Sequence, residues 1–284
     1  MEAFDDARFV RLHSRARRGM YAAADVDGAR VVLTPQRAVH NAVWAVQHAA
    51  AADGTPYALL RGAYGRYLAA SPAPPGAGAS HPRAAAQGEV AGDPPCSGLM
   101  WHAHPRRCGF VLRSGSGRFL RAAGRFLRWR RAVTAGADDG GAALQWAVER
   151  VPVRMTRPSI LDPARQLAYP RRRPPLECEV ARQVRYVRGG ADGSVDEGAW
   201  RTVQVVSNDL MQLRLTVACG MGAGRDLPRT TLCVRAGRRG QLAPLLVDLP
   251  IGTDRIDVVV LTHGTTADND LWYPDLDAPY RVDD

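Results

Sequence analysis

Apolar and polar residues alternate along short segments of the first 150 positions, and the same arrangement of segments recurs three times. Each copy has an apolar strand, a short turn that contains glycine, and a second strand that opens near an aromatic residue. The turn glycines are Gly19, Gly65 and Gly117, which lie 46 and 52 residues apart. Glycine suits tight turns because it adopts a positive φ at no steric cost. The pattern predicts a strand–turn–strand unit present in three copies.

A tryptophan follows each copy, at positions 44, 101 and 146. Period-two alternation and frequent Gly and Pro exclude a helical array, and a propeller needs at least four blades. Three copies within the length of one domain favour a β-trefoil, in which each copy gives one hairpin to a barrel and one to a cap. We therefore expect residues 1–152 to form a β-trefoil whose core contains Trp44, Trp101 and Trp146.

Two segments interrupt this pattern. The stretch from Ser71 to Ser97 is rich in Ala, Pro and Gly, which predicts a long surface loop inside the second copy. Residues 153–180 contain many prolines and the run Arg171-Arg172-Arg173, which predicts a linker between two domains.

The remaining residues, 181–284, have a different order of elements. Strands are expected at Gln183–Val187 and Trp200–Val206, followed by a helix that Ser207 or Asn208 caps and that ends near Gly220. Three more strands are expected at Thr231–Arg235, Leu242–Asp248 and Arg255–Thr262. The order ββαβββ suits a smaller α+β domain of the β-grasp, or ubiquitin-like, type. The chain as a whole is thus predicted to be mainly β.

Longer motifs give a resemblance to a known family. They are Gly65-Arg66-Tyr67-Leu68-Ala69, Gly117-Arg118-Phe119-Leu120-Arg121-Ala122, Trp146-Ala147-Val148-Glu149, residues 192–200, residues 233–242, and Leu271-Trp272-Tyr273-Pro274-Asp275. With them the chain resembles a plant family of unknown function that is described as actin-cross-linking-like, because its first domain is similar to the β-trefoil of fascin. The resemblance implies a fascin-like trefoil and a family-specific second domain. Actin filaments as the partner are an analogy of fold.

Charge is distributed unevenly along the chain. The net charge is +10, and all 38 basic residues are arginine. Residues 1–150 carry +9, residues 151–182 carry +4 and residues 183–284 carry −3. The first domain is therefore expected to attract acidic partners in a salt-dependent way, although a solvated arginine surface explains the same composition.

The leading hypothesis is a non-enzymatic binding or scaffold protein. On alternating strands of the third copy the apolar residues face the core and the arginines face water. We therefore expect an acidic protein surface, with actin filaments as the partner implied by the resemblance, to contact Arg113, Arg118, Arg121, Arg125 and Arg128. Nucleic acid is not expected, because the pattern leaves no exposed aromatic platforms. A single trefoil cross-links filaments only if it dimerises or exposes two faces.

Two other functions stay open. A carbohydrate- or small-ligand-binding trefoil of the lectin type usually needs polar amides on its loops, and Asn41 is the only asparagine in residues 1–150. An enzyme would need a pocket that unites distant groups such as Asp93, His102 and His104. The acidic pairs Asp254/Asp257 and Asp268/Asp270, and the carboxylates of the acidic tail, are expected to be solvated surface groups.

No cofactor and no metal is expected. The chain lacks the glycine-rich motifs of nucleotide-binding loops, and Cys96, His102, His104 and Cys108 match no familiar zinc spacing. Its five cysteines are unevenly spaced, which predicts reduced thiols. There is no apolar run long enough to span a bilayer and no apolar segment of a secretory signal, so we expect a cytoplasmic protein.

Overall fold

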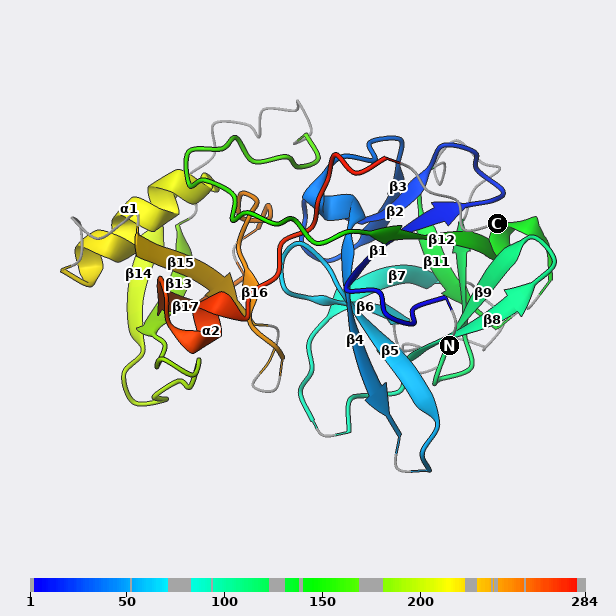
Figure 1. Ribbon diagram of the computed structural model, residues 1–284, viewed down its shortest axis with the longest axis horizontal. Coiled ribbons are helices and arrows are strands. Elements are labelled where there is room, and N and C mark those ends of the chain that lie inside the picture. Colours follow the sequence, from blue (N-terminus) through cyan, green and yellow to red (C-terminus); the bar gives the residue numbers. More distant parts are fainter. Residues whose placement is uncertain are drawn as a thin grey trace.

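A computed structural model describes residues 3–51, 53–70, 83–92, 94–122, 131–137, 140–168, 181–222, 229–235, 237, 240–252 and 254–279. In this part of the chain the first domain has twelve strands and two 3₁₀ turns, η1 (His40–Ala42) and η3 (Ala142–Leu144). The strands fall into three groups of four, in chain order, as the repeat predicts. Figure 1 shows the first domain on the right and the second domain on the left.

Six strands close into a barrel by pairing in a ring. The ring runs β1–β4–β5–β8–β9–β12 and returns to β1, always antiparallel. The barrel strands are β1 (Phe9–Ser14), β4 (Trp44–Ala50), β5 (Pro56–Arg61), β8 (Trp101–Arg106), β9 (Gly109–Ser114) and β12 (Gln145–Val151).

Three hairpins form the cap of the barrel. They are β2 (Tyr21–Ala24) with β3 (Val31–Thr34), β6 (Tyr67–Ala70) with β7 (Arg83–Gly88), and β10 (Phe119–Ala122) with β11 (Val133–Gly136). The hairpins also bridge one another at Arg30↔Ala86, Val32↔Ala132 and Thr134↔Ala84. A closed barrel and a threefold cap confirm the predicted β-trefoil.

The three indoles occupy equivalent places in the core. Trp44, Trp101 and Trp146 are each 0% exposed. Each indole N–H donates to the carbonyl of the second residue of the strand after the turn. These acceptors are Ala22 in β2, Leu68 in β6 and Leu120 in β10, at 3.0, 2.8 and 3.0 Å. The turn glycines 19, 65 and 117 have φ of 72, 74 and 79°. A buried donor needs an acceptor, so these bonds tie each turn strand to the core in the same way.

One prediction in the first domain is wrong. The stretch from Ser71 to Ser97 was expected to be a loop, yet its part at Arg83–Gly88 is strand β7, paired with β6 from Tyr67↔Gly88 to Ala70↔Ala85. A run of alanines has little β propensity of its own. The strand forms because each cap hairpin needs a second strand to satisfy the backbone groups of the first.

The second domain has a five-stranded mixed sheet in the order β14-β13-β17-β15-β16, in which β13 and β17 are parallel. Its elements are β13 (Arg182–Arg188), β14 (Arg201–Val205), α1 (Leu210–Gly220), β15 (Thr230–Val234), β16 (Ala243–Pro244), β17 (Ile256–Thr262) and α2 (Thr266–Asn269). Helix α1 buries Leu210, Leu213 and Val217. This arrangement is that of a ubiquitin-like fold, which confirms the predicted order of elements.

Two local predictions in this domain are wrong. The N-cap of α1 is Asp209, not Ser207 or Asn208, and its side chain accepts a hydrogen bond from the Gln212 amide over 2.8 Å. The Ser207 hydroxyl oxygen instead accepts a hydrogen bond from the Asp209 amide. The expected strand Leu242–Asp248 is regular only at Ala243–Pro244. The alternating residues Leu245, Val247 and Leu249 are still buried, because this segment packs its apolar side into the core without a continuous ladder.

The two domains share one continuous core. A single cluster of buried apolar residues includes Ala24, Leu60 and Leu68 of the trefoil. It also includes residues of the second domain from strands β13, β14, β15, β16 and β17 and from helix α1. At Gly65 an added Cβ would lie 2.8 Å from Val234 Cγ2. The Ile251 amide donates to the Val26 carbonyl over 2.7 Å. The interface is thus packed like a domain interior, which fixes the relative position of the domains.

Two crossing segments tie the domains together, as the green and red traces in Figure 1 show. Residues 153–168 leave the trefoil, and residues 270–279 return to it; Val153 bridges Pro274 between them. Arg157 donates to Asp268, whose side chain is 1% exposed, over 2.7 Å. Asp268 was expected to be solvated. Burial opposes its ionisation, but hydrogen bonds from Arg157, Gly264 and Thr231 outweigh burial and hold the pKa of Asp268 below its usual value.

The returning segment ends on a buried ion cluster in the trefoil. Arg11 and Glu149 face each other across β1 and β12, with side chains 0% and 1% exposed and an N···O distance of 2.7 Å. Arg37 also binds Glu149. The two guanidinium groups donate to the carbonyls of Leu276 and Ala278 over 3.1 and 2.8 Å. The segment expected to be a solvated acidic tail is therefore, as far as residue 279, part of the packed structure.

Candidate binding surfaces

The arginines predicted to bind a partner lie in different surroundings. Arg113, on β9, is exposed, and its guanidinium lies 5.8 Å from the centre of the Phe119 ring. Arg118 and Arg121, at the start of and within β10, are partly buried. Arg125 and Arg128 lie outside the described residues. Arg113 is thus exposed as predicted, whereas Arg118 and Arg121 are more buried than strand alternation predicts.

Other arginines extend the basic character of this region. Arg106 and Arg107 are exposed at the turn of the β8–β9 hairpin, and an added Cβ on the neighbouring Gly109 would lie 3.5 Å from Arg15 Nε. Burial, and then the charges of His102, Arg113 and Arg106, lower the pKa of His104. We call Arg15, Arg106, Arg107 and Arg113 the outer basic surface. The β8–β9 hairpin that carries it lies on the side of the trefoil away from the second domain (Figure 1).

The positive charges of the outer basic surface are not balanced by nearby carboxylates of the described residues. Among the described residues, none of its four arginines forms an ion pair with a carboxylate. Some arginines nearer the second domain are paired, for example Arg66 with Glu89 and Arg157 with Asp268. Uncompensated charges on one face raise the local potential and attract acidic partners over about a Debye length, roughly 8–10 Å in physiological salt.

The residues considered for metal or catalytic chemistry do not assemble. His102 and His104 share one face of β8, with ring centres 6.4 Å apart. Cys96 and Cys108 are exposed, and the described residues contain no group of three or more side chains placed to hold a metal ion. Asp93 lies outside those residues. Asn41, considered for a sugar site, is 0% exposed and bonds the Ala24 carbonyl over 2.9 Å and the Leu167 amide over 3.0 Å.

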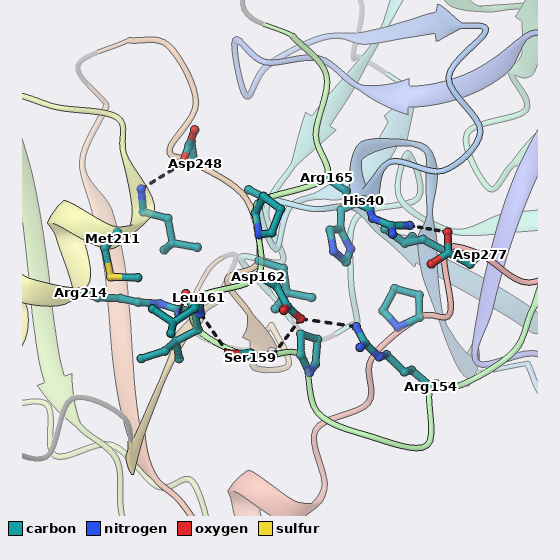
Figure 2. A pocket seen from close by; sticks show the side chains of 18 of the residues that line it. His40, Arg154, Ser159, Leu161, Asp162, Arg165, Met211, Arg214, Asp248 and Asp277 are labelled. Atoms are coloured by element: carbon teal, nitrogen blue, oxygen red, sulfur yellow. Dashed lines mark hydrogen bonds and ion pairs between the residues drawn. The ribbon is translucent and has the colours of Figure 1, made fainter.

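A second candidate site is a cavity of about 570 Å³ between the domains, shown in Figure 2. Its walls come from η1 of the trefoil, the crossing segment at 158–165, the start of α1, and the returning segment at 274–277. Cavities of this size are typical of small-molecule sites. The sequence did not predict it, because its walls are more than 200 residues apart in the chain and only the packing of the domains brings them together.

The carboxylates of this cavity already have partners within the chain. Asp162 accepts from the Ser159 amide over 3.0 Å and lies 3.9 Å from Arg154. Asp277 pairs with Arg165 over 2.5 Å. The others cap backbone amides: Asp209 that of Gln212, Asp248 that of Leu210, and Asp275 that of Asp277. These aspartates therefore serve the local structure of the cavity walls.

Arg214 of α1 is the exception among the charged groups. Its Nη1 lies 3.5 Å from the Ile160 carbonyl, at the limit of a hydrogen bond. Its Nε is buried and has no acceptor among the described residues, and no carboxylate there pairs with it. Burial lowers the pKa of Arg214, an effect that the nearby Tyr273 opposes. Arg214 is half-buried, and a buried Nε without an acceptor is costly in free energy.

His40 lies at the opposite side of the cavity. Burial, and then the positive charges of Arg165 and Arg154, lower its pKa to about 4. Figure 2 shows the imidazole between the labelled side chains of these two arginines. The imidazole is therefore neutral at physiological pH. Burial and both arginine charges favour the uncharged form, while the same two arginines are paired with Asp277 and Asp162.

The fold is that of a two-domain protein, a β-trefoil followed by a ubiquitin-like domain, with the cavity between them. The model of a β-trefoil domain of unknown function (DUF569) matches residues 1–149 of the chain, and the model of a DUF569-associated ubiquitin-like domain matches residues 180–261. The chain therefore belongs to the DUF569 family. This membership confirms the resemblance to a two-domain family that the sequence motifs indicated.

The solved structures that resemble the chain include several that match about half of it. A mosquitocidal holotoxin has 10% identity and a TM-score of 0.41, over 54% of this chain and 18% of that one. The Macrolepiota procera ricin B-like lectin, solved with lactose, has 15% identity and a TM-score of 0.39, over 51% and 96%. The designed threefold-symmetric protein ThreeFoil has 21% identity and a TM-score of 0.38, over 49% of this chain and 96% of that one. Likenesses this distant carry no argument about ligand or activity.

No curated protein matches the chain. In the described part of the structure, neither helix is long and apolar enough to cross a membrane.

Proposed function

We propose that the protein is a non-enzymatic binding protein whose trefoil docks onto an acidic protein surface through the outer basic surface. The observation that carries this proposal is that the four arginines of this surface have no carboxylate partner among the described residues. Arg113 also stacks on Phe119, which limits the freedom that its side chain would lose on binding.

The proposed partner is the actin filament. Support comes from the resemblance of the chain to an actin-cross-linking-like family, which is an analogy of fold, and from the positive charge of the trefoil, which an acidic filament would attract. Residues Arg118 and Arg121 border the same region and are proposed to contribute to the local potential. Because the chain has one trefoil, binding of filaments and cross-linking of filaments are separate questions.

Filament cosedimentation tests the proposal. We expect the protein to pellet with filaments at low salt and less at moderate salt, because added ions screen the exposed arginines. The double variant Arg107→Glu/Arg113→Glu should lose most of the binding. A matched control is Arg188→Glu/Arg201→Glu, which makes the same change in net charge at exposed positions of the second domain.

Two results would overturn the proposal. One is absence of pelleting at low salt. The other is an equal loss in the two double variants, because this would show a response to net charge rather than to the outer basic surface. Circular dichroism of both variants checks that they are folded.

A further inference from the structure

The cavity between the domains contains a charge that the protein itself does not balance. Each of its five aspartates accepts a hydrogen bond from the chain, and two of its three arginines are paired with aspartates. Arg214 alone has neither an ion pair nor a hydrogen bond shorter than 3.5 Å in the described residues. A guanidinium has five N–H donors, so most of its capacity to bind an anion is unused.

The surroundings of Arg214 favour an anion with an apolar body. Leu161, in the crossing segment, is 80% exposed beside the cavity, and Met211 and Leu246 line its wall. An exposed leucine next to a guanidinium offers apolar contact on one side and a bidentate partner for a carboxylate on the other. Figure 2 shows Arg214, Met211 and Leu161 gathered at one side of the cavity.

We infer that the cavity between the domains binds a small organic carboxylate, with the carboxylate on Arg214 and the apolar part against Leu161, Met211 and Leu246. The ligand would supply the anion that the half-buried guanidinium lacks, and it would cover apolar side chains that now face water. This site is separate from the outer basic surface, and it does not depend on the proposed binding of filaments.

A cationic ligand is the main alternative. The cavity wall contains five aspartates and three arginines, so its net formal charge is negative and attracts a cation at long range. At contact distance the preference reverses, because the aspartates are held by backbone amides and arginines while Arg214 is not. A neutral ligand would leave Arg214 without its partner.

Three probes of one shape separate these alternatives. Hydrocinnamate carries a carboxylate, hydrocinnamamide is its neutral analogue, and phenethylamine is a cation of similar size. Saturation-transfer NMR and calorimetry on the full chain should show millimolar or tighter binding of hydrocinnamate, and binding of the other two weaker by about tenfold or more, as for loss of a charge-assisted hydrogen bond.

Variants then locate the bound probe. Arg214→Gln should weaken hydrocinnamate by about tenfold or more. Arg201→Gln, an exposed arginine of the same domain, is the matched control and should leave it unchanged. Leu161→Asp changes an exposed side chain, so the fold should tolerate it; its charge should weaken hydrocinnamate and spare hydrocinnamamide. This second variant keeps the test valid if Arg214→Gln does not fold.

The inference is wrong if hydrocinnamate does not bind the folded chain at millimolar concentration. It is also wrong if the amide or the amine binds as well as the acid, or if binding of the acid is unaffected by both Arg214→Gln and Leu161→Asp. Binding lost equally in Arg201→Gln would place the probe elsewhere and would overturn it too.

Discussion

Arginines on opposite sides of the trefoil have different tasks. On the side of the second domain, Arg66 is paired with Asp254 across the domain boundary, and Arg157 of the crossing segment is paired with Asp268. On the outer side, Arg106, Arg107 and Arg113 face water without such partners among the described residues. The difference shows that a uniform composition conceals two uses of one residue type. One set holds the chain together, and the other is available to a partner.

The largest effect is expected where the paired arginines are most deeply buried. Glu149→Gln removes the anion between Arg11 and Arg37 and leaves two guanidinium groups uncompensated. Breaking a buried ion pair in this way typically costs about 3–5 kcal/mol of the free energy of unfolding. Urea unfolding, followed by tryptophan fluorescence, measures the loss. A loss below about 1 kcal/mol would contradict the view that this cluster anchors the returning segment.

The second prediction compares two equivalent turns on different sides of the trefoil. Gly19 and Gly65 have φ of 72 and 74°, so alanine strains both turns alike. Nothing lies within 4 Å of an added Cβ at Gly19, whereas at Gly65 Val234 would be 2.8 Å away. Gly65→Ala should therefore destabilise the protein by about 1–3 kcal/mol more than Gly19→Ala does, through overpacking.

Urea unfolding of both glycine variants provides the comparison. Equal losses would mean that the second domain moves away from the trefoil turn at little cost. That result would contradict a fixed interface between the domains.

The third prediction concerns pH at the cavity between the domains. Burial and two arginines lower the pKa of His40 to about 4 in the folded chain, from its ordinary value of 6.5. The unfolded chain therefore binds more protons between these pH values, and stability falls as pH falls from 6.5 to about 4. The share of His40 is on the order of 1–2 kcal/mol, since its side chain is only partly shielded from water.

His40→Gln should reduce this slope of unfolding free energy against pH. His13, His104 and His263 also have lowered pKa values, chiefly through burial, so the measurement is the difference between variant and wild type. An unchanged slope would show that His40 is open to solvent in solution.

The smallest effect is expected on the outer side. Arg106→Gln and Arg107→Gln remove exposed charges that have no ion-pair partner among the described residues. Their free energies of unfolding should stay within about 0.5 kcal/mol of wild type. A stabilisation larger than this would indicate that the arginines repel one another strongly. A destabilisation of that size would reveal a structural role and end the contrast between the two sides.

Much of the architecture could be predicted because it depends on local patterns that repeat. Gly19, Gly65 and Gly117 each set a turn, and Trp44, Trp101 and Trp146 each fill the same kind of place, so three copies implied the threefold fold. The candidate sites were less predictable. Arg113 was identified from strand alternation. Arg106 ends strand β8 where three consecutive residues are exposed, and Arg107 lies in the turn, so alternation gives no signal for either. Arg15 reaches the same region through packing.

By itself, the sequence determined which residues could enter a core and how often the chain turns, because side-chain periodicity and glycine conformation act over a few residues. Tertiary structure decided which partners those residues meet. It made a strand of the alanines at 84–86, buried Asp268 under Arg157, and left Arg214 without an anion. Each of these outcomes depends on groups distant in the chain, whose desolvation and pairing arise only when the two domains pack together.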